Sequence, residues 1–409
     1  MKLLSSIFEF FYKIYCRIFQ FIMFTFAHIL NWDPPQTIEG PNSILEIPKL
    51  LKKMDLKKPL VVTGRSLKRL GVCNDLFEKL QEEGFDYAYF SEAQPNPYIE
   101  NIEEAKEMYL KEKCDSFIAV GGGSTMDCTK LAACRIARPR TPLRWLVGVI
   151  RVIVKLPPVI AVPTTAGTGS EATIAGIVVD HSSKKKGLVI DPRLRPPYAI
   201  LDPCLTLTLP KHVTAETGMD ALTHAVEAYI GRGNMGKTRE YSEDAIKLIF
   251  ENLGKCYDNG NDIELRMNML KASFKAGLAF TQAYVGYVHA IAHALGGMYN
   301  TGHGLANAVI LPNVLEYYGD SVYESLAKLS DIIGIKCNRN DAEEKAKAFI
   351  EEIRKLNKKM EIPEKFDFIK PEDVKHIVDR ALAEGNPLYP VPKIMNRKDC
   401  ESIVKKIMC

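Results

Sequence analysis

The sequence predicts an α/β, Rossmann-like N-terminal domain followed by an all-α C-terminal domain. Between about residues 59 and 163, short apolar or β-branched runs alternate with helical stretches, which is typical of a parallel sheet with helical crossovers. After about residue 205 strand signals nearly vanish and helical periods dominate. A chain of 409 residues is long enough for two or three domains with a sizeable core.

Four strands and three helices are expected in the first half. The runs PLVVT, FDYAYF, SFIAV and VIAVP predict strands at residues 59–63, 85–90, 116–120 and 159–163. Helical stretches lie between them at about 67–83, 99–113 and 125–137. The second half predicts helices at 217–230, 240–256, 265–297, 304–317, 321–334 and 341–357. The segment LDPCLTLTLP marks the change, so we place the two domains at 37–204 and 205–409.

Residues 1–36 form an extension that we interpret as an amphipathic aromatic helix. Residues 1–31 hold seven of the seventeen Phe. Polar residues recur every three or four positions and draw one narrow stripe, at Lys2, Ser6, Glu9, Lys13, Arg17 and Gln20. The best apolar run, 18–30, is shorter than the roughly twenty residues of a transmembrane span, and no signal cleavage site follows. We expect packing against protein, including a subunit interface, slightly ahead of contact with a membrane surface.

Composition and charge narrow the class of protein. The chain is 46% hydrophobic and 25% charged, as ordinary globular proteins are, and its net charge of +4 is too small to indicate a nucleic-acid partner. Ten cysteines without a CxxC pair predict reduced thiols in the cytoplasm and no zinc ribbon. Residues 135–158 are basic and apolar; we favour a solvated loop, with peripheral membrane contact together with residues 1–31 as the alternative.

Two loops that follow strands suit a nucleotide. In SFIAVGGGSTMDCTK, residues 121–124 stand between a strand and a helix, where glycines let the backbone approach a pyrophosphate and the first helical amides point at it. The second loop, PTTAGTGSEAT, offers the hydroxyls of Thr164, Thr165, Thr168 and Ser170. Each loop alone also fits a tight turn or a helix cap. Two of them after strands of one sheet favour a nucleotide site.

The helical half gathers histidines and one acid. His289 and His293 are four residues apart on one helix face, and His303 follows the turn signal YNTG. Asp220 and His224 also share a helix face. One carboxylate with imidazoles suits divalent iron or zinc with an open position for a substrate oxygen, and a proton relay is the other use of such imidazoles. We expect the active site in the cleft between the two halves.

Taken together, these motifs resemble those of the iron-containing alcohol dehydrogenases, also called group III. GGGSTMD, IAVPTTAGTGSEAT, LDPCLTLTLP, TGMDALTHAVEAYI and VHAIAHALGGMYNTGHGLANAVILPNV occur in the order and spacing of that family, over about residues 37–405. The resemblance implies the dehydroquinate synthase-like fold, with a dinucleotide-binding domain and a helical metal-binding domain. It further implies reversible hydride transfer between NAD(P) and a primary or secondary alcohol, an aldehyde or ketone in reverse, by a homo-oligomer.

The family's functional residues match positions in this chain. Its metal ligands fall on Asp220, His224, His289 and His303, with Fe²⁺ as the expected metal and zinc as the alternative. His293 matches a position near the metal, and we expect it to be catalytic by helping to pass a proton. The cofactor positions fall on Asn96, Gly122, Gly123, Ser124, Asp127, Thr164, Thr165, Thr168 and Lys186.

One departure from the family concerns the cofactor. After the first strand many members have an acid that accepts the ribose hydroxyls, whereas VVTGRSLKRLG has Gly64 there. Without that carboxylate a 2′-phosphate is not repelled, and Arg65, Lys68 or Arg69 would pair with it. We therefore expect NADP to be used at least as well as NAD.

Two other functions stay open at this stage. A hydroxyacid-oxoacid transhydrogenase would share the fold but keep its nucleotide bound, so turnover that depends on free cofactor would argue against it. A dehydroquinate-synthase-like lyase needs a cluster of phosphate-binding basic residues that the metal motifs lack. A catalytically inactive binding protein is disfavoured because all four metal-ligand types are present.

Overall fold

The computed structural model describes residues 2–27, 32–180, 185–337 and 341–409, and its contacts divide the chain into two compact units. The α/β unit comprises Trp32–Leu209 and Asn259–Gly277. The helical unit comprises Met1–Asn31, Pro210–Asp258 and Leu278–Cys409. The fold class is the one predicted, an α/β part with a parallel sheet and an all-α part.

This division differs from the predicted 1–36, 37–204 and 205–409 in two respects. Residues 259–277 contact the α/β unit, because Lys271 pairs with Glu39 at 3.2 Å and the Ser273 hydroxyl accepts the Gly169 N–H at 3.2 Å. The N-terminal helix belongs to the helical unit instead of standing alone, because its polar side chains bond the backbone of residues 387–392.

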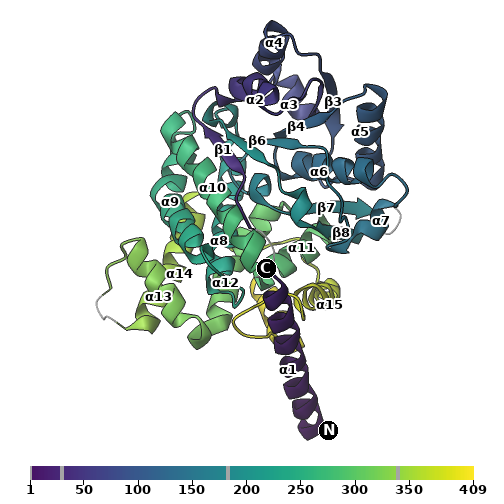
Figure 1. Ribbon diagram of the computed structural model, residues 1–409. Coiled ribbons are helices and arrows are strands. Elements are labelled where there is room, and N and C mark those ends of the chain that lie inside the picture. Colours follow the sequence, from purple (N-terminus) through teal and green to yellow (C-terminus); the bar gives the residue numbers. More distant parts are fainter. Residues whose placement is uncertain (1, 28–31, 181–184, 338–340) are drawn as a thin grey trace. The chain divides into compact units, whose positions relative to one another are not determined.

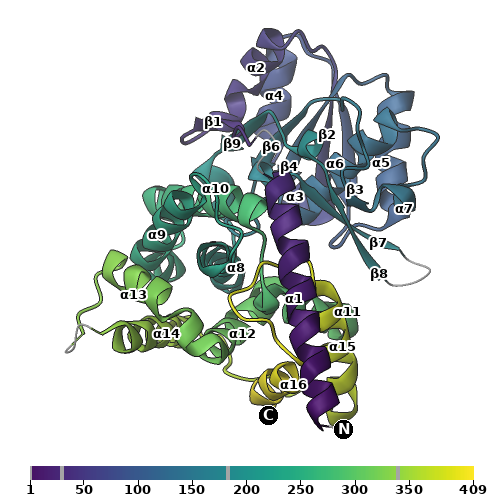
Figure 2. The same cartoon turned by 60° about the horizontal axis from the view of Figure 1, so that its bottom comes forward.

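The larger sheet has six parallel strands in the order β1-β9-β6-β4-β2-β3. Figure 1 labels β1, β6, β4 and β3 of this sheet, and Figure 2 labels all of its strands. They are β1 (Gln36–Glu39), β2 (Pro59–Gly64), β3 (Ala88–Ala93), β4 (Ser116–Gly121), β6 (Val159–Pro163) and β9 (Tyr198–Leu201). Strands β2, β4 and β6 are central and buried throughout apart from Gly64, as expected of continuous apolar runs covered on both faces.

Alternate residues of the central strands face opposite layers of helices. Leu60, Phe117 and Ala161 share one core with α5 (Ile99–Lys111) and α6 (Gly123–Ala137). Val61, Ile118 and Ile160 share the other with α2 (Ile47–Lys53) and α4 (Asn74–Glu82). Figure 2 shows these two pairs of helices on opposite sides of the sheet. The layers hold the carboxyl ends of β4 and β6 side by side.

Several details of the α/β unit differ from the predictions. The expected strand 85–90 is β3 at Ala88–Ala93, and the expected helix 67–83 is split into α3 (Arg65–Arg69) and α4. The edge strand β1 and its neighbour β9 have no predicted counterpart. A second sheet pairs β7 (Ala175–Asp180) antiparallel with β8 (Lys185–Ile190), and β5 (Gly148–Val149) joins β8.

The helical unit is built around α8 (Lys211–Ile230), which is buried over most of its length and packs against α9 (Thr238–Asp258) and α12 (His303–Tyr318). The predicted helix 265–297 is in fact two helices, α10 (Ile263–Ala283) and α11 (Tyr287–Tyr299). The chain breaks at Tyr284, whose φ is +64°. Further helices are α13 (Tyr323–Ile332), α14 (Ala342–Lys359), α15 (Val374–Gly385) and α16 (Arg397–Lys406).

The N-terminal helix α1 spans Lys2–Ala27, in agreement with the predicted amphipathic helix. Its polar stripe faces protein: Arg17 donates to the carbonyl oxygens of Val391 and Pro392 at 2.8 and 2.9 Å, and Gln20 donates to that of Tyr389 at 2.7 Å. Its aromatic side is turned outward. No helix among the described residues is both long and apolar enough to cross a bilayer.

Candidate metal centre and cofactor site

The four predicted metal ligands come from three helices of the helical unit. Asp220 and His224 stand one turn apart on α8, His289 lies in the first turn of α11, and His303 begins α12. One ligand atom from each lies within 4.8 Å of every other. The imidazole Nε2 atoms of His303 and His289 are 3.3 and 3.8 Å from Asp220 Oδ1. The structure therefore brings together all four residues that the family resemblance implied.

This donor set fits a divalent metal ion. Asp220, His224 and His289 are at most 5% exposed, whereas the side chain of His303 is 36% exposed and opens the site on one side. Burying a carboxylate among imidazoles is costly unless a cation balances it. Three imidazoles and one carboxylate are donors that Fe²⁺ and Zn²⁺ both accept.

Glu227 fixes the orientation of His289, and the sequence reasoning did not identify it. Its carboxylate lies 2.6 Å from His289 Nδ1 and also accepts the N–H groups of Gly286 and Val288, both at 2.8 Å. Burial raises the pKa of Glu227 to about 8 and lowers that of His289. The arrangement keeps the proton on Nδ1 between the two groups and turns Nε2 toward Asp220. Glu227 stands seven residues after Asp220, so helical spacing was a signal for it.

Asn307 is a second residue that the sequence reasoning missed. Its amide Nδ2 donates to Asp220 Oδ1 at 2.7 Å and lies 3.3 Å from Nε2 of both His289 and His303. It follows His303 by four residues on α12 and so shares its helix face. Asn307 thus contacts three of the four candidate ligands and limits how far the carboxylate can turn.

His293 lies beside the four ligands but is held differently. Its ring stacks on that of His303, with centroids 5.0 Å apart and planes at 17°. Its Nδ1 is 2.6 Å from Glu384, whose carboxylate also accepts the Tyr389 hydroxyl at 2.7 Å. With Nδ1 tied to α15, the other ring nitrogen Nε2 is the one suited to exchange a proton with substrate. Glu384 is 91 residues from His293, and no sequence signal joins the two.

The two glycine- and hydroxyl-rich loops meet in the α/β unit. They follow the neighbouring strands β4 and β6, and the Thr164 N–H donates to the Gly121 carbonyl at 3.2 Å. A Cβ on Gly122 would lie 3.1 Å from Thr165 Oγ1, and one on Gly123 would lie 2.9 Å from Thr168 Cγ2. Glycine is needed here because the loops touch. Gly122 caps α6, so the first amides of that helix are presented at the same place, as an anion site requires.

Lys130 anchors the second loop and was not predicted. The ammonium group of this buried residue of α6 donates to five acceptors between 2.6 and 3.1 Å: the carbonyl oxygens of Ser170, Thr173 and Ala175 and the hydroxyls of Ser170 and Thr173. It therefore fixes the end of this loop, where the Ser170 N–H donates to the Thr168 hydroxyl at 3.3 Å. Lysine is the only side chain with this reach and three donors on one nitrogen.

The remaining predicted cofactor residues gather around α6. The Asn96 N–H donates to the Ser124 hydroxyl at 3.2 Å, with Asn96 at a φ of +50°. Burial raises the pKa of Asp127 to about 7, opposed mainly by the charge of Lys130. The Val179 N–H donates to the Pro97 carbonyl, joining the loop after β3 to β7 and hence to Lys186 of β8.

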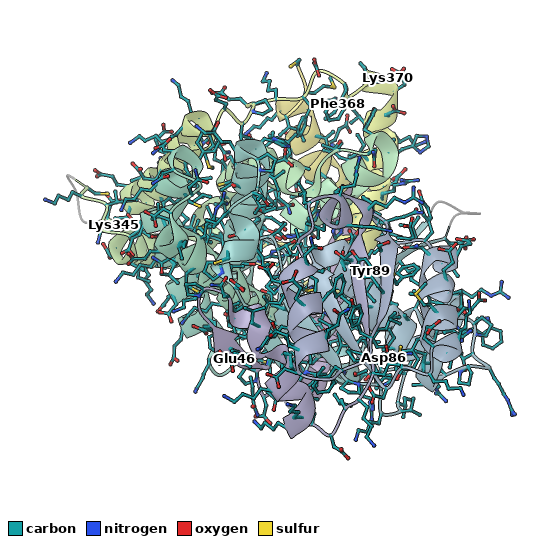
Figure 3. The ribbon with its side chains drawn as sticks, turned by 90° about the horizontal axis from the view of Figure 1, so that it is seen from above. Glu46, Asp86, Tyr89, Lys345, Phe368 and Lys370 are labelled. Atoms are coloured by element: carbon teal, nitrogen blue, oxygen red, sulfur yellow. The ribbon has the colours of Figure 1, made fainter. Side chains whose placement is uncertain are left out.

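Gly64 ends β2 beside α3, where the sequence predicted contact with the ribose. Arg65 forms an ion pair with Glu92 of β3, and Arg65 is the main reason that the pKa of Glu92 is lowered. Lys68 lies 5.9 Å from the ring centre of Tyr89, a residue labelled in Figure 3. An acid therefore stands near this position after all, contributed by the next strand and neutralised by a cation.

Both halves of the chain match models of one known protein family. Residues 34–203 match the family model described as iron-containing alcohol dehydrogenase, and residues 214–408 match that of the C-terminal domain of the same family. The chain is 34% identical to the NAD-dependent methanol dehydrogenase of Bacillus methanolicus, over 92% of this chain and 98% of that one. It is 36% identical to the 1,3-propanediol dehydrogenase of Citrobacter freundii, over 90% and 95%.

The solved structures include a similar fold. A crystal structure of 1,3-propanediol oxidoreductase superimposes with a TM-score of 0.89 at 33% identity, covering 93% of this chain and all of that one.

Proposed function

Because the chain belongs to the iron-containing alcohol dehydrogenase family, we propose that Asp220, His224, His289 and His303 hold Fe²⁺ in a metal-dependent, NAD-linked alcohol dehydrogenase. The observation that carries the proposal is the convergence of these four donors within 4.8 Å. Zinc is the alternative metal, and metal analysis of protein purified without oxygen distinguishes the two.

The helical unit supplies the metal-binding and proton-transferring residues, and the α/β unit supplies the nucleotide-binding residues. Oxidation of an alcohol removes a hydride from carbon and a proton from oxygen; when bound, the metal supplies a Lewis acid for the oxygen and nicotinamide supplies the hydride acceptor. His293 Nε2 takes the proton, while Glu384 holds the ring through Nδ1. Glu227 keeps His289 in its orientation. Gly122 and Gly123 would admit the pyrophosphate of a bound nucleotide. The rest of the nucleotide would contact Thr164, Thr165, Thr168, Asn96, Ser124, Asp127 and Lys186.

Short primary alcohols are the substrates that we propose to test first. Two relatives that are at least 34% identical over nine-tenths of this chain are named for methanol and 1,3-propanediol. We also propose that the enzyme works in the cytoplasm, because each of its ten cysteines is a free thiol.

We propose, as a finer point, that NADP is used at least as well as NAD. Gly64 carries no carboxylate to repel a 2′-phosphate, the nearby carboxylate of Glu92 is neutralised by Arg65, and Lys68 adds positive charge. The substitution Gly64→Asp should lower kcat/KM for NADP by about tenfold or more and spare NAD, since it restores a like charge at contact distance. Steady-state kinetics with both cofactors measure this.

The control for this substitution is Gly64→Ala. A Cβ at residue 64 lies 3.2 Å from the Ala93 carbonyl oxygen, so alanine reports the steric cost alone. A strong preference of the unmodified enzyme for NAD, or equal losses for aspartate and alanine, would contradict the NADP proposal.

A further inference from the structure

The outward face of α1 is the largest exposed apolar surface that a single element of the described chain presents. Large side chains that are between 48 and 74% exposed occupy it: Phe8, Phe11, Tyr15, Ile18, Phe21 and Ile22. Aromatic residues of this size are ordinarily the first to be buried. A contiguous patch of them marks a surface that meets something other than water.

The orientation of this face is fixed by the opposite side of the helix. Arg17 and Gln20 donate to backbone carbonyls of residues 387–392, and Glu9 accepts from Asn396, which caps α16. Figure 2 shows α1 running beside α16. Because the polar stripe is used by these bonds, α1 cannot roll to bury its aromatic residues without breaking them. The helix is therefore bound to the rest of its unit by its polar side, and its apolar side stays exposed.

The width of the face favours a fluid occupant over a second copy of the chain. At 100° per residue, the exposed positions from Phe10 through Ile18 to Tyr12 cover about 200° of the helix circumference. A helix that packs on one other helix buries a stripe of roughly 100°, which would leave about half of this face in water. The headgroup and acyl boundary of a bilayer covers a half-cylinder without that loss.

A second exposed apolar site lies in the α/β unit, and basic residues accompany it in the sequence. Trp145, Ile150 and Ile153 are 66, 39 and 57% exposed, and the exposed basic residues around them in sequence are Arg140, Arg144, Arg151 and Lys155. No acidic residue occurs between Cys128 and Ser170. Ile150 and Ile153 have φ values of +52° and +58°, which β-branched residues rarely adopt. Tryptophan among arginines is the composition of a segment that meets anionic headgroups.

We propose that the enzyme binds peripherally to an anionic lipid surface through the outward face of α1, which inserts at the headgroup boundary. In the α/β unit, the 145–153 segment is a lipid-contacting site in its own right. Arg135 is excluded from the basic surface, since it is buried and bonded to Glu103 and to backbone carbonyls. The proposal is independent of the catalytic reaction.

Co-sedimentation of the full chain with vesicles tests the proposal. The probes are vesicles of phosphatidylglycerol mixed with phosphatidylcholine, and vesicles of phosphatidylcholine alone. The triple variant F8S/F11S/F21S should bind the mixed vesicles at least about tenfold more weakly, because each lost Phe removes a buried apolar side chain. The matched control L70S/L110S changes exposed leucines elsewhere and should bind like the unmodified protein. Turnover of all three should be equal.

Each other outcome overturns the proposal in a defined way. Unmodified protein that stays in the supernatant, or a triple variant that sediments equally, removes the lipid role of α1. Equal binding to both vesicle types removes the anionic preference. If light scattering shows a larger assembly that the triple variant dissociates, and no vesicle binding occurs, the face belongs to a second copy of the chain.

Discussion

Replacing His289 with alanine should release the metal and lower kcat by about a thousandfold or more. The loss removes one of four ligands and also leaves the buried carboxyl of Glu227 without its His289 partner. A Lewis acid supplies several kcal/mol of transition-state stabilisation, and each 1.36 kcal/mol is about tenfold in rate. Elemental analysis of anaerobically purified protein, together with steady-state turnover, measures both effects.

The control for this variant is His376→Ala, which removes an exposed imidazole of α15 outside the site. It should keep both metal and turnover. A His289→Ala protein that retains stoichiometric metal would show that the four donors do not act as one ligand set. Thermal melting of both variants separates metal loss from misfolding.

Replacing His293 with alanine should keep the metal and slow turnover by about a hundredfold or more. The residue lies next to the ligand set but is bonded through Nδ1 to Glu384, so its expected task is to move a proton, a contribution that is typically 10²- to 10⁴-fold. The variant should also lose one limb of the pH profile of kcat, which a purely structural role would not change. Metal content and the pH profile are the two readouts.

The variant to compare with His293→Ala is His303→Ala. The two rings stack on each other at 5.0 Å, so steric effects of the two truncations are similar, yet only His303 reaches Asp220. The His303 variant should lose metal. Equal loss of metal from both variants would make His293 a fifth ligand and would refute its separate role.

Helical spacing in the sequence pointed to Asp220 and to several histidines, and the family resemblance then separated the candidate ligands from His293. Asp220 and His224 are four residues apart, and His289 and His303 flank a turn. Glu227 and Asn307 follow the same spacing from Asp220 and His303, so the same argument, carried one or two turns further, reaches them. Glu384 differs, because it approaches His293 from α15 and only the tertiary fold joins them.

The break between α10 and α11 shows why helical periodicity alone failed there. The sequence keeps an apolar period from 265 to 297, but the N–H groups of Gly286 and Val288 are taken by Glu227, about sixty residues earlier. A long-range side-chain cap of this kind leaves no mark in a local pattern. It also starts α11 at the point that puts His289 at the centre.

The missed strands have local reasons. Residues Gln36–Glu39 of β1 are mostly exposed, so no apolar run marks this edge strand. Strand β3 extends past the apolar residues through Ser91 and Glu92, and Glu92 meets Arg65 as a result. In α1 the polar stripe was read correctly as a helix, yet which side meets protein depends on carbonyl groups of residues 387–392 that the sequence does not place.

Cofactor reduction by protein purified without oxygen is the most direct test of a metal-dependent alcohol dehydrogenase. Methanol, 1,3-propanediol and longer alcohols are offered with added NAD or NADP, before and after removal of metal by a chelator and again after iron is restored. We expect stoichiometric iron and turnover that needs free cofactor. Turnover should be lost with the chelator and recovered when iron is restored. Turnover unaffected by metal removal, or hydride exchange between a hydroxyacid and an oxoacid without added cofactor, would contradict it.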